Sequence, residues 1–135
     1  MIIPAYNEEE SILNTVMSIL EYRKKVDFDL DYVVINDGSV DRTKEILDSH
    51  NLNAIHLVMN LGIGGAVQTG YKYALEKNYD VAVQFDGDGQ HDIESLDALL
   101  EPIRRQQADL VVGSRFIGDK ASEFQTTFMR RFGIT

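Results

Sequence analysis

Short apolar runs alternate along the chain with longer segments in which apolar residues recur every three or four positions. The short runs are typical of buried strands, and we expect strands at residues 1–3, 32–35, 54–59, 81–85 and 110–112. The periodic segments are typical of helices, and we expect helices at residues 8–23, 41–50, 62–77 and 93–106. This alternation predicts an α/β fold in three layers, with a mostly parallel, doubly wound sheet between helices.

Three local signals refine these boundaries. Asn7 is expected to cap the first helix, with Glu10 three positions later in a capping box. Pro102 is expected to kink or split the last helix. After Arg115 the alternating pattern is lost, and the first strand begins at residue 1, so we expect the chain to be a truncated part of a longer domain.

Length and composition narrow the function. The 135 residues suit a single domain with its own core. A net charge of -9 argues against a nucleic-acid binder, and a polyphosphate ligand would need a divalent cation or local arginines. The absence of cysteine excludes disulfides and thiolate metal sites and suits the cytosol. No apolar run approaches the roughly 18 residues of a membrane span.

Polar or glycine residues follow each expected strand directly. In a parallel sheet, the segments after the strands all lie at one edge, where such folds bind ligands. One polar turn carries little weight, but five at the same edge predict a cleft. The five segments are residues 4–8, 37–39, 60–65, 86–92 and 113–115.

Two carboxylates, Asp86 and Asp88, come directly after the fourth expected strand and flank Gly87. Alone, such a pair would be read as a solvated acidic turn. After a buried strand, however, both can face one Mg²⁺ or Mn²⁺ ion, which takes oxygen ligands and bridges carboxylates to substrate phosphates. Gln90 and His91 are close enough in the chain to complete or support the ligand set.

Each of the other side chains at the same edge could have a ligand-binding role or a structural role. Glu8 and Asp37 offer acceptors for a base N–H or ribose hydroxyls, although a helix-start charge and a turn residue are the structural alternatives. Tyr6 could stack on a base or fill the wall of the cleft. Arg115 could bind a phosphate bidentately or lie on the surface.

The glycine cluster at residues 62–65 matches no phosphate-binding motif. Val67 stands where the third glycine of a dinucleotide-binding motif belongs, and no Gly-Lys-Ser/Thr follows. We expect the cluster to let a helix approach the sheet closely, with Ala66 and Gly70 on the packing face. The three histidines show neither metal-ligand nor catalytic-triad spacing, and His56 is expected to be structural.

Taken together, these segments resemble family 2 glycosyltransferases with the GT-A fold, most closely the dolichyl-phosphate or polyprenyl-phosphate sugar synthases. The resemblance covers residues 1–116 and rests on five motifs in the family's order. They are Pro4-Ala5-Tyr6-Asn7-Glu8-Glu9, Asn36-Asp37-Gly38-Ser39-Val40-Asp41, Asn60-Leu61-Gly62 with Gly64-Gly65-Ala66, Asp86-Gly87-Asp88-Gly89-Gln90-His91 and Val111-Val112-Gly113-Ser114-Arg115-Phe116.

The resemblance implies a role for each motif. The first two would hold the nucleoside, chiefly through Pro4, Tyr6, Glu8 and Asp37, with Ala5, Asn7 and Gly38 beside them. Asp86, Gly87 and Asp88 would flank the diphosphate, and Asp88, Gln90 and Asp86 would bind Mg²⁺ or Mn²⁺. Arg115, with Arg130 or Arg131, would contact phosphates of the donor or of the acceptor. Residues 1–116 would then bind the nucleotide sugar, and residues 117–135 would begin the acceptor side.

The implied reaction is transfer from a nucleoside-diphosphate sugar, a GDP- or UDP-sugar, to a lipid-phosphate or glycan acceptor, with inversion. No nucleic-acid partner is implied. We expect a cytoplasmic protein, at the cytoplasmic face of the membrane if the acceptor is a lipid. Peripheral membrane association would run through regions beyond this chain, and the oligomeric state stays open.

Three alternatives are weighed against this reading. A sugar-phosphate nucleotidyltransferase usually has a glycine-rich loop after its first strand, where this chain has residues 4–7. A haloacid-dehalogenase-type phosphatase needs its aspartate pair after the first strand, whereas here the pair follows the fourth. A domain that binds nucleotide without transferring a sugar is the non-enzymatic alternative.

Overall fold

The computed structural model describes residues 1–86 and 92–113 of the chain. The chain divides into two compact units, Met1–Glu94 and Ser95–Thr135, and each is described by itself. The first unit contains the sheet and helices α1 to α3. The second contains helix α4 (Leu96–Arg104), which follows a short 3₁₀ turn at Ile93–Ser95 and includes Pro102.

The sheet of the first unit is parallel. Its strands are β1 (Ile2–Ala5), β2 (Val33–Asn36) and β3 (Ala54–His56), in the spatial order β1-β2-β3. Ile3 pairs with Val34, and Ile35 pairs with Ile55. The expected α/β class with a parallel sheet is therefore confirmed.

Residues 81–85 lie along the other edge of β1, although only Gln84 forms a bridge, in parallel with Ile2. The backbone N–H of Ile2 donates to Val83 O at 2.8 Å, and Phe85 N–H donates to Ile2 O at 2.9 Å. The expected fourth strand thus takes its predicted place beside β1 through a single bridge, and its carboxyl end lies at the same edge as those of β1 and β2.

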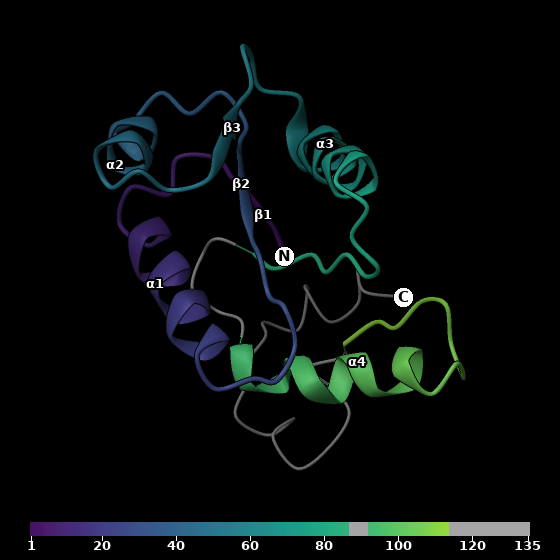
Figure 1. Cartoon of the computed structure of the whole chain (residues 1–135). Coiled ribbons are helices and arrows are strands. Elements are labelled where there is room, and N and C mark those ends of the chain that lie inside the picture. The colour runs from purple at the N-terminus through teal and green to yellow at the C-terminus, as the bar shows by residue number, and fades with distance from the viewer. Residues whose placement is uncertain (87–91, 114–135) are drawn as a thin grey trace, which may run out of the picture. The chain divides into compact units, whose positions relative to one another are not determined.

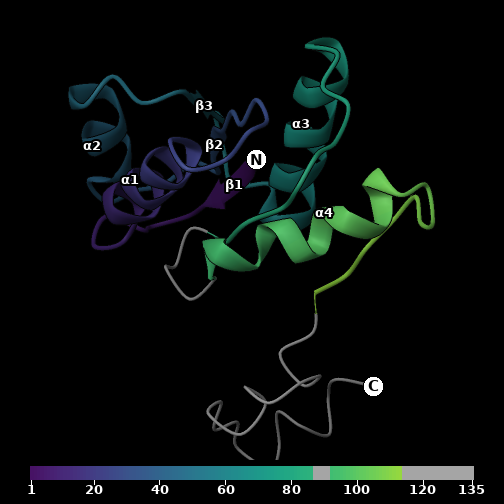
Figure 2. The same cartoon turned by 60° about the horizontal axis from the view of Figure 1, so that its bottom comes forward.

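Helices cover both faces of this sheet. Helices α1 (Ile12–Arg23) and α2 (Thr43–Ser49) lie on one side of the strands, and α3 (Gly62–Glu76) lies on the other (Figures 1 and 2). This is the expected three-layer arrangement. No helix among residues 1–86 and 92–113 is long and apolar enough to span a membrane.

The core forms where these helices meet the strands. On α1 the buried residues Ile12, Val16 and Ile19 recur at helical spacing, so one face of the helix is apolar. On α3 the buried residues are Ala66, Gly70 and Ala74, which are small.

Close packing between α3 and β1 explains these small residues. A Cβ atom on Gly70 would lie 2.2 Å from Ile2 Cγ2, a separation that side chains do not tolerate. The expected place of Ala66 and Gly70 on the packing face is therefore confirmed. The expected role of the glycine cluster is wrong, because a Cβ on Gly62 or Gly64 would meet no atom within 4 Å.

Two local expectations are wrong. Asn7 does not cap α1: the helix begins after Ser11, and Asn7 has a left-handed backbone with φ of 56°. The reason is tertiary, because Asn7 Oδ1 accepts a hydrogen bond from Val40 N–H in the next loop. The capping box with Glu10 fails for the same reason, and Ser11 Oγ instead donates to Glu8 Oε2 at 2.7 Å.

The expected strands at 54–59 and 110–112 also differ from the structure. The third strand ends at His56, and Val58 is fully exposed. Residues 110–112 form no strand, and Leu110 and Val112 are 78% and 80% exposed. A strand exists through hydrogen bonds to a neighbour, and residues 95–113 of the described chain contain no second extended segment to supply them.

Candidate functional site

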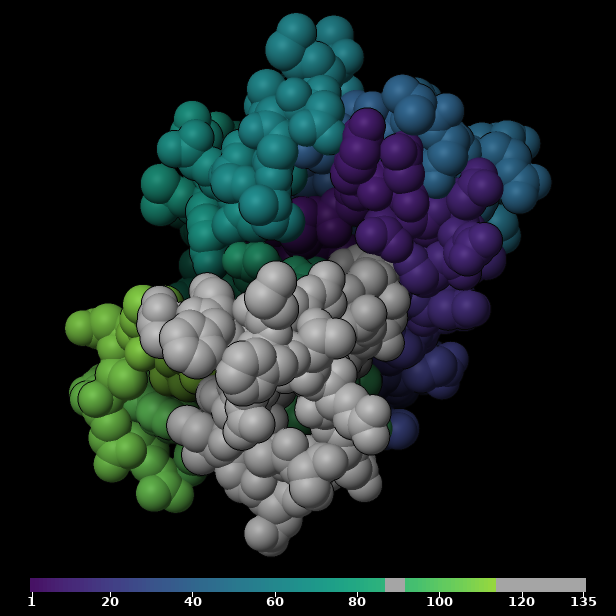
Figure 3. Space-filling view, turned by 180° about the vertical axis from the view of Figure 1, so that it is seen from behind, coloured from purple at the N-terminus to yellow at the C-terminus, as the bar shows by residue number. Residues whose placement is uncertain are grey.

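A cleft of about 490 Å³ opens at the carboxyl edge of the sheet in the first unit. In the space-filling view, a hollow lies between the teal surface around α3 and the purple surface near the N-terminus (Figure 3). The cleft is lined by residues at the carboxyl ends of β1 and of the 81–85 segment and by residues that follow the three strands and this segment. They are Pro4, Ala5, Tyr6, Glu8, Asp37, Asn60, Gly62, Ile63, Ala66, Gln84 and Asp86.

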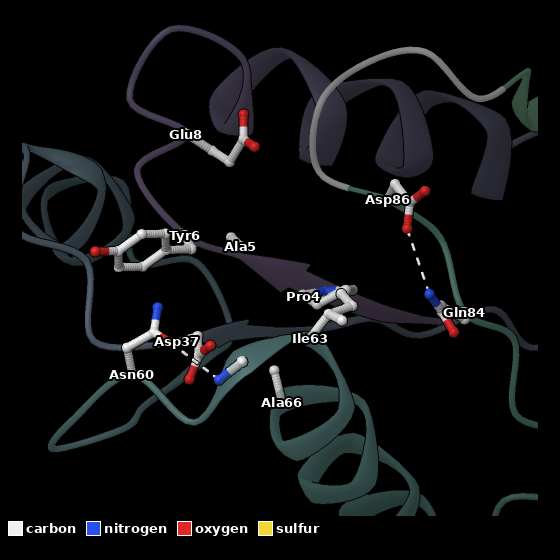
Figure 4. Close-up of a pocket in the computed structure, with 11 residues that line it drawn as sticks. Pro4, Ala5, Tyr6, Glu8, Asp37, Asn60, Ile63, Ala66, Gln84 and Asp86 are labelled. Atoms are coloured by element: carbon white, nitrogen blue, oxygen red, sulfur yellow. Dashed lines mark hydrogen bonds between the residues drawn. The ribbon is translucent and has the colours of Figure 1, made fainter. Parts of the chain in front are cut away.

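The lining residues separate into two ends. Tyr6, Asp37 and Asn60 gather at one end of the cleft, while Gln84 and Asp86 lie at the other (Figure 4). The first end combines an aromatic ring with a carboxylate and an amide. The second end carries the carboxylate that begins the Asp86-Gly87-Asp88 motif.

Asp37 is fixed by backbone groups of two neighbouring segments. Its N–H donates to Ala5 O at 2.9 Å, which continues the pairing of β2 with β1. Its Oδ1 accepts a hydrogen bond from Leu61 N–H at 2.7 Å. The side chain is buried, so a charged acceptor is held at the wall of the cleft instead of rotating freely in solvent.

Gly38 makes this arrangement of Asp37 possible. Its φ is +67°, which favours glycine, and a Cβ atom there would lie 2.7 Å from both Met59 C and Asn60 N. The glycine therefore lets the β2–α2 loop touch the β3–α3 loop, which brings Asp37 and Asn60 to the same end of the cleft.

Tyr6 and Glu8 come from the loop between β1 and α1. The Tyr6 side chain is partly exposed and lines the cleft, and an aromatic ring there can stack on a base. Glu8 is oriented by its neighbours, because its N–H donates to Thr43 Oγ1 at 2.9 Å and its Oε2 accepts from Ser11 Oγ.

A set of hydrogen bonds locks the β1–α1 loop to the β2–α2 loop. Asn7 N–H donates to Ser39 Oγ at 3.0 Å, and Glu9 N–H donates to Asp41 Oδ2 at 3.1 Å. Asp41 Oδ1 accepts from the hydroxyl of Thr43 at 2.6 Å and from its N–H at 2.9 Å. The loops that carry Tyr6, Glu8 and Asp37 are thus joined to each other rather than independent.

The same hydrogen bonds also affect the pKa of Asp41. Partial burial alone would raise its pKa, but the hydrogen bonds donated by Thr43 and by Glu9 N–H outweigh that effect. The pKa of Asp41 is therefore held below its ordinary value.

Asp86 lies at the cleft with its Oδ1 accepting from Gln84 Nε2 at 3.4 Å. Gln84 reaches this position because it makes the bridge to Ile2 in β1. The described lining includes three carboxyl side chains, Glu8, Asp37 and Asp86, and no lysine, arginine or histidine. A diphosphate cannot approach them without a neutralising cation or arginines from elsewhere.

Several predicted site residues meet in this cleft, and others do not. Six line it: Pro4, Ala5, Tyr6, Glu8, Asp37 and Asp86. Asn7 and Gly38 are not in the described lining, and both shape the loops instead. The remaining predicted residues lie outside the described part of the chain: Gly87, Asp88, Gln90, Arg115, Arg130 and Arg131.

Sequence reasoning assigned no ligand role to Asn60, Ile63 or Gln84, which also line the cleft. Asn60 had a signal, since it opens the third of the five motifs. The sequence contained no signal for Gln84, because a polar residue inside an expected buried strand does not show which face of the sheet it lies on.

The described residues hold no group of three or more potential metal ligands. Of the three predicted ligands, only Asp86 is described, and Asp88 and Gln90 are among the residues that follow it. A carboxylate at the cleft is a suitable oxygen ligand for Mg²⁺ or Mn²⁺, so Asp86 fits such an ion as one of its ligands.

Comparisons with known proteins identify the family of the chain. A family model described as "Glycosyl transferase family 2" matches residues 1–132. An undecaprenyl-phosphate mannosyltransferase of Micrococcus luteus is 38% identical over 132 residues, which cover 93% of this chain and 52% of that protein. A UDP-N-acetylglucosamine–dolichyl-phosphate N-acetylglucosaminyltransferase of Methanococcus voltae is 36% identical, covering 89% and 53%.

The chain spans about half the length of the curated relatives it matches. Among solved structures, a crystal structure of S. aureus TarS is 24% identical and covers 80% of this chain and 32% of that chain, with a TM-score of 0.48.

Proposed function

Because the chain belongs to glycosyl transferase family 2, we propose that it transfers a sugar from a nucleoside-diphosphate sugar to the phosphate of a polyprenyl or dolichyl lipid. The family makes the protein a glycosyltransferase. The acceptor is proposed from the names of its relatives, which include undecaprenyl phosphate and dolichyl phosphate, and one of these names also includes a UDP-sugar.

The observation that carries the donor assignment is the division of the cleft into two ends. Tyr6 and Asp37 at one end provide a stacking surface and a fixed acceptor, which suit a base or ribose. Asp86 at the other end begins the carboxylate motif that suits a cation and a diphosphate. A nucleoside diphosphate has the same order of groups.

The proposed reaction inverts the sugar. An oxygen of the acceptor phosphate attacks the anomeric carbon, a new carbon–oxygen bond forms, and the bond to the diphosphate breaks. The nucleoside diphosphate leaves with the bonding electrons. Since the attacking phosphate is already anionic near neutral pH, the reaction does not need a strong general base.

The main requirement of the reaction is then to stabilise the negative charge of the leaving diphosphate. Asp86, Asp88 and Gln90 would hold Mg²⁺ or Mn²⁺, which when bound offsets the charge of the diphosphate. Arg115, and Arg130 or Arg131, would supply further positive charge to donor or acceptor phosphates. Glu8 and Asp37 would orient the nucleoside. Because both are carboxylates, they add negative charge to the cleft, which the cation and the arginines would offset.

Calorimetric titration of the protein with UDP, GDP, CDP and ADP, with Mn²⁺ and with EDTA, tests the donor assignment. We expect UDP or GDP to bind, and to bind more tightly with Mn²⁺. Tyr6→Ala should weaken this binding by about tenfold, since one stacked base contributes roughly 1–3 kcal/mol.

Tyr71→Ala is the matched control. Tyr71 is 44% exposed against 45% for Tyr6, but it lies on α3 away from the cleft lining. Equal losses in both variants, or no nucleotide binding at all, would contradict the donor assignment. Transfer from a radiolabelled sugar donor to a polyprenyl phosphate, with the plain polyprenol as control, then tests the acceptor. Binding without transfer would favour a nucleotide-binding domain that needs further chain for activity.

A further inference from the structure

A chain of hydrogen bonds runs from the surface of α2 to the loops of the cleft, and His56 is its central member. On one side, His56 Nε2 lies 2.9 Å from Asp48 Oδ1 on α2. On the other side, His56 Nδ1 lies 3.0 Å from Asn36 Nδ2 at the end of β2. His56 itself is the last residue of β3, so it bridges the helix layer and the sheet.

The amide of Asn36 can face His56 in only one way. Ser39 N–H, which is a donor, points at Asn36 Oδ1 at 3.2 Å. The NH₂ group of Asn36 therefore faces the ring and donates to it. His56 Nδ1 must then carry a lone pair, and the proton of the neutral ring lies on Nε2, where it is donated to Asp48.

The carboxylate of Asp48 is ionised and accepts this hydrogen bond. Its other oxygen pairs with Lys44 on the same helix. The hydrogen bond from Lys44, followed by that from His56, lowers the pKa of Asp48 below its ordinary value, so the carboxylate stays ionised.

The other end of the chain reaches the cleft. Asn36 holds Ser39 N–H, and Ser39 Oγ in turn accepts from Asn7 N–H at 3.0 Å. Asp37 lies between Asn36 and Ser39 in this turn, and Asn7 lies between Tyr6 and Glu8. The Asn36 amide is thus one of the groups that fix the two loops at the nucleoside end of the cleft, beside the hydrogen bonds of Asn7, Glu9 and Asp37.

We propose that His56, as the neutral Nε2–H tautomer, is a positioning residue for the nucleotide: it fixes Asn36 and, through it, the turn that presents Asp37. His56 is not in the cleft lining, so it acts through Asn36 and touches no ligand. This inference rests on the proposed binding of a nucleoside diphosphate in the cleft.

Two substitutions at His56 each remove one of the two hydrogen bonds of the ring and keep the other. The amide of Asn occupies the place of Nδ1, so His56→Asn keeps an acceptor for Asn36 and loses Asp48. The amide of Gln occupies the place of Nε2, so His56→Gln keeps a donor for Asp48 and loses Asn36. Each variant loses one hydrogen bond, and urea unfolding should show similar losses of stability.

Nucleotide affinity should differ between the two variants. With UDP or GDP as the probe, whichever the wild type binds, His56→Gln should raise the dissociation constant about five- to tenfold, the effect of one lost hydrogen bond. His56→Asn should stay within about twofold of wild type. Equal affinities in the two variants, or losses that follow stability alone, would overturn the proposal.

Two NMR measurements are independent of nucleotide. The ¹⁵N shifts of the His56 ring should show a protonated Nε2 and an unprotonated Nδ1. Amide exchange at Ser39 should be faster in His56→Gln than in His56→Asn. The opposite tautomer, or equal exchange, would overturn the positioning role. If the wild type binds no nucleotide but both NMR results hold, the proposed function fails and the role of His56 in the loop stands.

Discussion

The carboxylate of Asp37 accepts a hydrogen bond from the backbone N–H of Leu61 at 2.7 Å, which ties the end of β2 to the start of α3. Asp37→Asn should therefore affect binding and stability together. If the new amide oxygen faces Leu61, an NH₂ donor replaces the acceptor on the cleft side; if the NH₂ group faces Leu61, two donors meet. We expect nucleotide affinity to fall at least tenfold in calorimetry and stability to fall by about 1–2 kcal/mol.

Asp29→Asn provides the control for this change. Asp29 is exposed and precedes β2, so it lies at the opposite end of that strand from Asp37. Unchanged nucleotide affinity in Asp37→Asn, or an equal loss in Asp29→Asn, would show that Asp37 does not contact the ligand.

The close approach of α3 to β1 yields a test of the fold. Gly70→Ala places a methyl group 2.2 Å from Ile2 Cγ2, and Ile2 is buried in β1, so the pair must separate. We expect the free energy of unfolding in urea to fall by about 1–3 kcal/mol. Gly64→Ala, in the same helix with no atom within 4 Å of the new Cβ, should instead raise it by about 0.5–1 kcal/mol. A stable Gly70→Ala protein would contradict the observed packing.

Much of this fold could be predicted because periodicity reports burial directly. The apolar runs located the sheet, and the small residues Ala66 and Gly70 indicated the packing face of α3 before the structure showed it. The candidate site was predictable for a related reason: in a parallel sheet, the order of strands alone determines which loops share an edge.

What could not be predicted depends on contacts between segments distant in sequence. Asn7 has the residue type and spacing of a helix cap, but its side chain instead bonds Val40 in another loop. Residues 110–112 have the composition of a strand, but residues 95–113 include no second extended segment with which they could pair. The ring of His56 is tied to residues 20 and 8 positions away, and no short-range pattern reports such pairs.

The loop lock predicts a measurable change in the pKa of Asp41. Thr43→Val keeps the shape of a buried side chain and removes the hydroxyl that bonds Asp41 Oδ1 at 2.6 Å. With one donor lost, the pKa of Asp41 in the folded protein should rise toward its ordinary value, as measured by NMR titration of the carboxyl carbon. The pKa of Asp48, whose lowering is due to Lys44 and His56, should stay unchanged and is the internal control.

The same change predicts how stability depends on pH. A carboxyl whose folded-state pKa is depressed adds stability above its unfolded pKa of about 3.9, and that stability is lost as the pH falls through the folded value. The decline of unfolding free energy below about pH 4 should therefore be shallower in Thr43→Val than in wild type. Parallel pH profiles for the two proteins would contradict the assigned cause.

Asp86 and Asp80 stand at opposite ends of the 81–85 segment, and only Asp86 lines the cleft. Asp86→Asn should weaken the Mn²⁺-dependent part of UDP or GDP binding by at least about tenfold, as lost metal ligation does. It should leave binding of the corresponding nucleoside, which has no phosphates, unchanged. Asp80→Asn should alter neither affinity.

EDTA should lower the affinity of the wild type for the nucleoside diphosphate and have little further effect on Asp86→Asn. If Asp86→Asn instead weakens nucleoside and nucleoside diphosphate equally, Asp86 supports the cleft wall and the cation is held elsewhere.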